Sequence, residues 1–285
     1  MDIQKIFLQL QKKVNQRLEL FFDRKAKELK NFSPLTKQLF KEIKDFSLAG
    51  GKRIRPIFLY YGYLAGGGKN KKAILDASIC VELIHNYLLI HDDIIDKDEF
   101  RRGKPTIHEI YRTIYQKKFL DSKHLGVSAG ILAGDFCSVF GYDILVNSKF
   151  PLELKLKAIQ KLNQILIEVV EGEMLDVFLG LDHQLSQNDI FKILEYKSAR
   201  YTVEGPLHLG AILAGANGNL LKRLSQYAIP LGIAFQIQDD ILGMFGEPKK
   251  TCKPSGNDLK EAKQTILILK ARQLASPKQR KIINT

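Results

Sequence analysis

The spacing of apolar residues along the chain indicates helices. Leu152, Leu156, Ile159 and Leu162 recur every three or four residues, as on the buried face of an amphipathic helix. Sustained alternation of apolar and polar residues, which would indicate strands, is hard to find. Together these patterns predict an all-α bundle of about nine or ten helices. Glycine and proline clusters separate the helices at residues 49–51, 66–68, 102–105, 148–151, 215–218 and 246–256.

Length and composition favour one soluble domain. The chain has 285 residues, of which 45% are hydrophobic, so it can bury one large core. Because no Pro/Ser-rich or low-complexity stretch divides it, we predict a single domain over residues 1–285. Three widely spaced cysteines argue against a disulfide framework and indicate a cytoplasmic protein. No apolar run approaches the ~20 residues that a spanning helix needs, so we expect no integral membrane span.

The net charge favours anionic partners. Lys and Arg number 44 against 31 Asp and Glu, which gives a formal charge of +13. Interleaved aromatic and basic residues and zinc-finger spacing are both absent, so nucleic acid is not expected. Phosphorylated small molecules fit this charge better.

Three aspartates end a long apolar helix that is predicted to start near Ala73. At ~100° per residue, Asp92 and Asp96 share one face of this helix, and Asp93 lies near its edge. Converging carboxylates repel one another unless a counter-ion is present. Hard oxygen ligands select Mg²⁺, which bridges carboxylates to phosphates. The alternative, a solvated acidic helix end, is about as frequent for a lone motif of this kind.

A second acidic pair and several cations add to this pattern. Asp239 and Asp240 follow the apolar stretch 227–237, which we predict to be a helix that ends there. Two such helix ends could face each other across one cavity. His85 lies about two turns before Asp92 on nearly the same face, although a lone helix histidine is more often a core residue. Arginine and lysine, which bind phosphate oxygens, cluster at residues 52–55, at 101–102, at 197 and at 253.

These residues resemble the trans-isoprenyl diphosphate synthases, also called the polyprenyl synthetase family. The resemblance spans about residues 46–268. Its motifs are GGKRIRP from Gly50, HDDIIDKDEFRRGKPT from His91, GD at Gly134, GEMLD from Gly172, YKS from Tyr196, FQIQDD from Phe235 and KPSGNDLKEAKQT from Lys253. The resemblance implies an all-α homodimer in which each subunit surrounds a deep central cavity, with both acidic signatures at its mouth.

The resemblance also implies roles for individual residues. Mg²⁺ and an allylic diphosphate would bind at Asp92, Asp93, Asp96 and Asp239, with Asp240 beside them. The allylic diphosphate would also contact Arg101, Lys197 and Lys253. Isopentenyl diphosphate would bind at Lys52, Arg55, His85 and Arg102, with Phe235 and Gln236 between the two sites.

The implied reaction is ionisation, condensation and elimination. Mg²⁺ and cationic side chains stabilise charge on the departing diphosphate, so the allylic C–O bond breaks. The double bond of isopentenyl diphosphate then attacks, and loss of a proton restores an alkene. Oxygen atoms of Lys197, Ser198 and Gln236 are expected to stabilise the passing carbocation.

Three departures from the family pattern bear on activity. Gly243 stands where a third aspartate often follows the second signature. Ser198 replaces the commoner threonine, and Cys252 the commoner glycine before Lys253. The chain also stops at Thr285, where relatives usually continue. A catalytically weak subunit of a heteromer is therefore one alternative, and a terpene cyclase is another, although a cyclase needs no second diphosphate site.

Product length is expected to depend on side chains below the first signature. The family pattern points to Tyr87 and Leu88, whereas an ideal helical wheel places Leu88 and Leu89 under the acids and turns Tyr87 away. One aromatic and one aliphatic residue here are typical of short-chain synthases. We expect geranylgeranyl (C20) diphosphate as the product, with farnesyl (C15) or a longer chain as alternatives.

Overall fold

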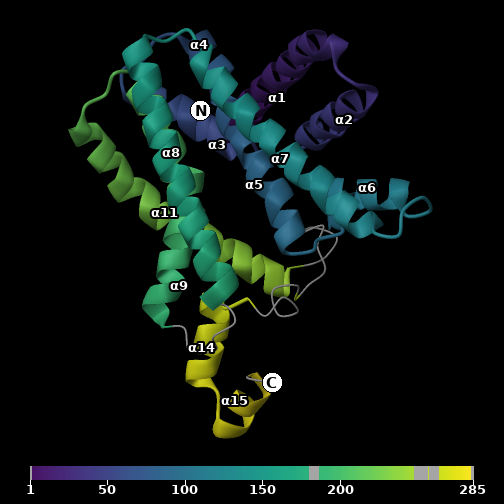
Figure 1. The fold of residues 1–285 in the computed structure, drawn as a ribbon. Coiled ribbons are helices and arrows are strands. Elements are labelled where there is room, and N and C mark those ends of the chain that lie inside the picture. The colour runs from purple at the N-terminus through teal and green to yellow at the C-terminus, as the bar shows by residue number, and fades with distance from the viewer. Residues whose placement is uncertain (1, 180–185, 247–255, 257–262, 284–285) are drawn as a thin grey trace. The chain divides into compact units, whose positions relative to one another are not determined.

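The computed structural model describes residues 2–179, 186–246, 256 and 263–283. The described residues are mostly helical, which confirms the all-α prediction (Figure 1). They contain more helical segments than the nine or ten predicted, because several long helices are interrupted. The chain forms two compact units, residues 1–159 with 210–215 and residues 160–209 with 216–285. The single-domain organisation over residues 1–285 stays a prediction.

The first unit contains seven α-helices before α8 and a short hairpin. A two-stranded antiparallel ladder pairs Phe100 with Pro105 and Arg101 with Lys104. In chain order the elements are α1 (Ile3–Glu28), α2 (Pro34–Leu48), α3 (Ile54–Ala65), α4 (Lys71–Ser78), α5 (Cys80–Ile95), β1 (Phe100–Arg101), β2 (Lys104–Pro105), α6 (Ile107–Tyr115) and α7 (Ser122–Val146).

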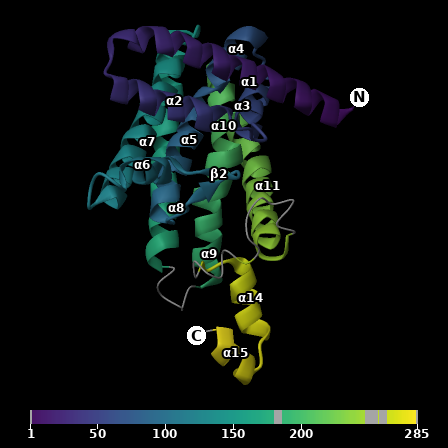
Figure 2. The ribbon, with the colours of Figure 1, turned by 90° about the vertical axis from the view of Figure 1, so that its right-hand side faces the viewer.

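Aromatic side chains pack the core of the first unit. Helices α1 and α2 form a helical hairpin (Figures 1 and 2). Phe21 and Phe22 of α1 meet Phe40 of α2 and Phe140 of α7 in edge-to-face contacts, with ring centroids 5.5 to 6.0 Å apart. Such edge-to-face pairs add to the stability gained from burial alone. This cluster therefore ties the N-terminal hairpin to α7.

Glycines on α7 allow α5 to approach closely. A Cβ atom on Gly134 would lie 2.3 Å from Nε2 of His91, and one on Gly141 would lie 2.7 Å from Ile84. Both distances are too short for a side chain, so these glycines leave the space that the His91 ring and the Ile84 side chain of α5 occupy. This contact fixes the direction of α5, whose last turn carries the first acidic signature.

The second unit holds the second acidic signature. Its elements are most of α8 (Leu152–Met174), a π-helical segment at Leu175–Leu179, α9 (Gln187–Ile193), a π-helical segment at Leu194–Glu204, most of α10 (Gly205–Leu213), α11 (Gly218–Phe245), α14 (Ile266–Leu274) and α15 (Pro277–Ile283). Ile190, Leu194 and Ile266 form a buried cluster, against which Ile233 and Ile237 of α11 pack.

The position of the second signature corrects one prediction. Helix α11 continues to Phe245, so Asp239 and Asp240 lie inside its last turns and not at its end. Gly243 does not stop the helix. The backbone becomes extended only at Gly246, where φ is −70° and ψ is 150°.

Two helical stretches are long and apolar enough, by length and composition, to cross a membrane. They are Lys71–Ile95 and Ser122–Val146. In their most apolar 18-residue stretches, 72% and 50% of the stretch is buried inside the protein. The sequence prediction required an uninterrupted apolar run, whereas these stretches are apolar on average and contain isolated charges such as Glu82. Because a core helix of a soluble protein passes the same test, this is weak support for a span. The absence of a membrane span and the cytoplasmic location stay predictions.

Candidate functional site

The first acidic signature is turned back toward the protein by the end of α5. Lys97 adopts the left-handed conformation with φ 58°. Its backbone N–H donates to the carbonyl of Ile94, and the N–H of Asp98 donates to the carbonyl of Asp93 at 2.9 Å. These two bonds form a Schellman motif, which ends a helix and reverses the chain direction. The hairpin that follows therefore returns over the last turn of α5.

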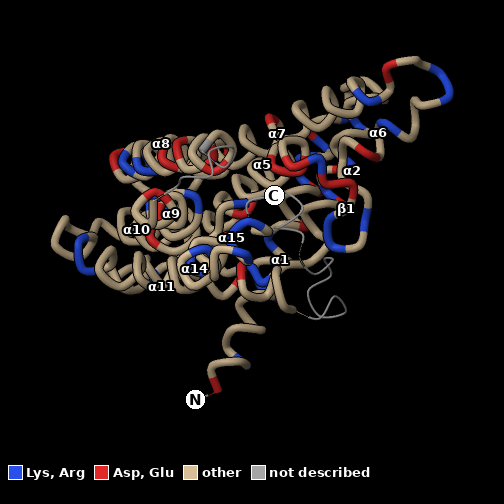
Figure 3. The backbone as a smooth tube through the Cα atoms, turned by 90° about the horizontal axis from the view of Figure 1, so that it is seen from below, with Lys and Arg blue, Asp and Glu red and all other residues tan. Residues whose placement is uncertain are grey.

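This reversal places Arg101 on the carboxylates. Its Nε donates to Oδ1 of Asp93, and its Nη2 lies 3.6 Å from Oδ2 of Asp92 and 3.7 Å from Oδ2 of Asp98. Figure 3 shows acidic and basic residues adjoining where α5 ends and β1 begins. The sequence grouped Arg101 with the acidic signature by its phosphate-binding chemistry and by resemblance, and the hairpin gives the physical reason.

Asp93 differs from its neighbours in being buried. It is 1% exposed, whereas Asp92 and Asp96 are half-buried. Burial raises the pKa of Asp93 to about 7, although the Arg101 guanidinium acts in the opposite direction. Its second oxygen, Oδ2, has no hydrogen-bond partner among the described residues. A buried carboxylate oxygen in this position is suited to a cation.

The carboxylates at the end of α5 do not by themselves form a complete metal-binding site. Within the described ranges, no three His, Cys, Asp or Glu side chains are placed to hold a metal ion together. Arg101 engages one oxygen of Asp93. The donor set consists of carboxylates, which Mg²⁺ prefers, and a diphosphate would supply further oxygens. The residues thus fit a metal that arrives with its substrate.

The basic loop before α3, residues 49–53, lies beside the hairpin. Nη1 of Arg102 donates to the carbonyl of Gly50 at 2.7 Å. Arg101 and Arg102 are adjacent in sequence, so one contacts the carboxylates and the other contacts the basic loop. Lys52 is exposed on this loop, and Arg55 follows in the first turn of α3. The acidic and basic groups predicted from the first half of the sequence are therefore brought together.

His85 lies among these cations. Burial lowers its pKa well below the usual range, and the guanidinium groups of Arg55, Arg102 and Arg101 lower it further. The imidazole is therefore neutral at pH 7. Positive charges around a neutral imidazole favour an anion. This set is suited to a phosphate group, with His85 as a neutral hydrogen-bond donor.

Tyr87 belongs to a different face of α5. Its ring meets that of His91 edge to face, with centroids 4.8 Å apart. Burial raises the pKa of Tyr87, with a further contribution from Asp135 of α7. Tyr87 thus lies toward α7. The placement agrees with the helical wheel, which turns Tyr87 away from the acids and leaves Leu88 under them.

In the second unit, a chain of side chains orients Gln236. Oγ of Ser198 donates to Oε1 of Gln236 at 2.8 Å, and Nε2 of Gln236 donates to Oδ1 of Asp240 at 2.9 Å. Asp240 is 9% exposed, while Asp239 is exposed. Asp240 is therefore engaged with Gln236, and Asp239 is the carboxylate of this pair that reaches solvent. Phe235 is half-buried on the same helix.

Lys197 is held by two carboxylates that sequence reasoning did not assign. Its Nζ lies 2.6 Å from Oδ2 of Asp176 and 2.9 Å from Oε2 of Glu173. A Cβ on Gly172 would lie 2.7 Å from the backbone nitrogen of Lys197, so a glycine is needed where the two segments meet. Glu173 and Asp176 belong to the GEMLD motif, which was the available signal. Lys197 and Ser198 lie in the π-helical segment, and such segments are frequent at functional sites.

Two predictions lie beyond what the structure describes. Lys253 falls outside the described residues. The two acidic signatures belong to different units, so their predicted arrangement across one cavity stays a prediction. The roles of the individual site residues also stay predictions.

Comparison with known proteins adds to this geometry. Residues 37–285 match the family model described as polyprenyl synthetase. The chain is 32% identical over 237 residues to a geranylgeranyl diphosphate synthase of Sulfolobus acidocaldarius, covering 82% of this chain and 69% of the relative. It is 33% identical over 227 residues to a geranylfarnesyl diphosphate synthase of Aeropyrum pernix, covering 78% and 67%.

A solved structure resembles the whole chain. The geranylgeranyl pyrophosphate synthase of Corynebacterium glutamicum, complexed with isoprenyl diphosphate and magnesium, superposes with a TM-score of 0.91 at 35% identity, covering 100% of this chain and 81% of that one. The family model spans most of the chain, and it coincides with the motifs at the end of α5 and in the basic loop. The chain belongs to the polyprenyl synthetase family.

Proposed function

We propose that the protein is a Mg²⁺-dependent prenyltransferase that condenses isopentenyl diphosphate with an allylic diphosphate. The observation that carries this proposal is the hairpin in the first unit. It places Arg101 on the carboxylates of Asp92 and Asp93 and Arg102 on the basic loop. A metal-binding group and an anion-binding group thus adjoin, as a reaction between two diphosphates requires.

Each group of residues has a distinct task in this proposal. In the first unit, Asp92, Asp93 and Asp96 would hold Mg²⁺, which supplies charge stabilisation to the departing diphosphate. Arg101 binds that diphosphate. Isopentenyl diphosphate is bound by Lys52, Arg55 and Arg102, and neutral His85 donates a hydrogen bond to it. The Ser198–Gln236–Asp240 chain holds the Gln236 oxygen in one orientation, which suits it to stabilise a passing carbocation.

A product assay tests the proposal. Purified protein is incubated with Mg²⁺, isopentenyl diphosphate and each of dimethylallyl, geranyl and farnesyl diphosphate, and product length is measured. We expect condensation that depends on both substrates, with a C20 product. Release of diphosphate from the allylic substrate alone would indicate a cyclase. No turnover under any condition would indicate a subunit that needs a partner.

Leu88→Phe is expected to shorten the product. Leu88 is half-buried on α5, four residues before Asp92, and a larger side chain there reduces the apolar volume below the diphosphate. We expect the main product to change from C20 to C15 in the same assay. Tyr87→Phe is the matched control, because Tyr87 contacts His91 and should leave product length unchanged. Unchanged product length for Leu88→Phe would refute this assignment.

An exposed apolar stripe supports a homodimer. Leu125, Leu132, Val139 and Val146 recur every seven residues on α7, and Leu132 and Val139 are 55% and 63% exposed. Apolar residues with a seven-residue repeat typically pack against a second helix. We therefore propose that α7 contacts α7 of a second copy.

Charges on this stripe are expected to separate the subunits. In the double variant Leu132→Glu, Val139→Glu, two carboxylates would be buried between the subunits, and the dissociation constant should rise at least ~100-fold. Light scattering after size exclusion should show a dimer for the wild type and a monomer for the variant. Leu8→Glu, at an exposed position of α1, is the control. Equal masses for wild type and variant would contradict the proposal.

A further inference from the structure

The basic loop has a backbone that needs support from its surroundings. Gly50, Gly51 and Arg53 have φ angles of 98°, 133° and 55°. Glycine adopts such angles readily, whereas a residue with a side chain adopts the left-handed conformation only at a cost. Contacts from elsewhere must therefore hold Arg53 in this conformation.

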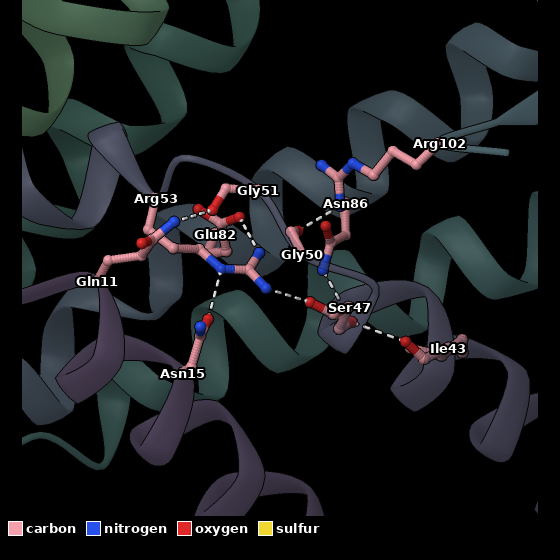
Figure 4. Close-up of polar contacts among 10 residues, drawn as sticks. All are labelled: Gln11, Asn15, Ile43, Ser47, Gly50, Gly51, Arg53, Glu82, Asn86 and Arg102. Carbon is pink, nitrogen blue, oxygen red and sulfur yellow. Dashed lines mark hydrogen bonds and ion pairs between the residues drawn. The ribbon is translucent and has the colours of Figure 1, made fainter. Parts of the chain in front are cut away.

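Arg53 points inward and not toward a ligand. It is 2% exposed, and all of its guanidinium nitrogens are bonded within the protein (Figure 4). Nη1 donates to Oε1 of Glu82 on α5 at 2.5 Å, and Nη2 donates to the carbonyl of Ser47 at the end of α2 at 2.7 Å. Nε donates to Oδ1 of Asn15 on α1 at 2.8 Å. Three helices thus converge on one side chain of the loop.

Helix α1 makes a second contact with the same loop. Nε2 of Gln11 donates to the carbonyl of Gly51 at 2.7 Å, so Gln11 and Asn15, one helical turn apart, present two amides to the loop (Figure 4). Lys52 lies between the two contacted residues, Gly51 and Arg53. Helix α1 ends at Glu28, before residue 37, where the match to the family model begins.

We propose that Gln11 and Asn15 of α1 act as positioning residues for the anion-binding side chains Lys52 and Arg55. The mechanism is indirect. The two amides and Glu82 fix the backbone of Gly51 and the side chain of Arg53, so that Lys52 is presented outward and Arg55 is held in the first turn of α3. This inference rests on the proposed function, because it concerns the residues assigned to isopentenyl diphosphate.

The steady-state test compares the two substrates. In the double variant Gln11→Ala, Asn15→Ala, we expect KM for isopentenyl diphosphate to rise about 10-fold, because the loop must then be ordered when the substrate binds. KM for the allylic substrate should change less than about twofold. Gln9→Ala and Gln16→Ala, exposed amides on the same helix, are the matched controls. The single variant Asn15→Asp should keep the wild-type KM, because the new carboxylate still accepts a hydrogen bond from Nε of Arg53.

A second measurement does not depend on turnover. Hydrogen exchange of a peptide covering residues 49–55 should become faster in the double variant than in either control, and calorimetry with inorganic diphosphate should show weaker binding. If the wild type makes no product, the proposed function fails. Hydrogen exchange and diphosphate binding still test whether α1 positions the basic loop. The inference is overturned if loop exchange is unchanged, or if both KM values rise equally.

Discussion

Asp92→Asn is expected to lower kcat by about 1,000-fold, equivalent to about 4 kcal/mol of activation free energy. The substitution keeps the size of the side chain but removes the charge that a divalent cation requires. Asp92 is half-buried at the end of α5, and its Oδ2 lies 3.6 Å from Nη2 of Arg101. In the variant, Arg101 faces one fewer carboxylate, so the net charge at this site becomes more positive and disfavours a metal cation.

The measurement is a Mg²⁺ titration of steady-state turnover, with the wild type in parallel. We expect the variant to need a higher Mg²⁺ concentration for half-maximal rate and to remain slow at saturation. Asp45→Asn, an exposed aspartate on α2, is the control for loss of one negative charge. A variant that retains a third or more of wild-type kcat would remove Asp92 from the proposed metal site.

Glu82→Ala is expected to lower the free energy of unfolding by about 3–5 kcal/mol. The carboxylate of Glu82 is the charged partner of Arg53, and the side chains of this pair are 3% and 0% exposed. Removing the carboxylate leaves a buried guanidinium without a counter-charge. Urea unfolding followed by circular dichroism would measure the change, with Glu19→Ala on the exposed face of α1 as the control.

Two further variants separate loss of charge from loss of packing. Glu82→Gln keeps an oxygen acceptor for Nη1 of Arg53, so it should lower the free energy of unfolding less than Glu82→Ala does. The double variant Arg53→Met, Glu82→Leu removes both charges and should recover much of the lost stability. If the free energy of unfolding of Glu82→Ala lies within 1 kcal/mol of the wild-type value, the buried pair is not a main source of stability.

Local spacing predicted the all-α fold, and the arrangement of the first signature stays a prediction. Apolar periodicity indicated the all-α fold, and the angular position of Asp92 and Asp96 followed from helix geometry alone. The position of Arg101 on Asp93 could not be predicted in this way, because it depends on left-handed Lys97 and the returning hairpin. The motif GGKRIRP shows the same limit. Its cations look alike in sequence, yet Arg53 is directed into the core and Lys52 to the surface.

The second signature was harder to interpret because its surroundings are irregular. The apolar stretch 227–237 suggested a helix that ends there, but α11 continues to Phe245 through residues that are largely exposed, such as Leu242 and Phe245. The π-helical segment at Leu194–Glu204 changes the register of side chains after α9. Periodicity of 3.6 residues therefore could not place Lys197 opposite Glu173 and Asp176.

The close contact between α5 and α7 limits how this enzyme family member can diversify. A side chain at Gly134 or Gly141 would displace the His91 ring or the Ile84 side chain of α5. Leu88 lies only ~40° from Ile84 around an ideal helix, so the position proposed to set product length adjoins this contact. A change at residue 88 is therefore expected to be tolerated only where the packing of Ile84 against α7 is kept.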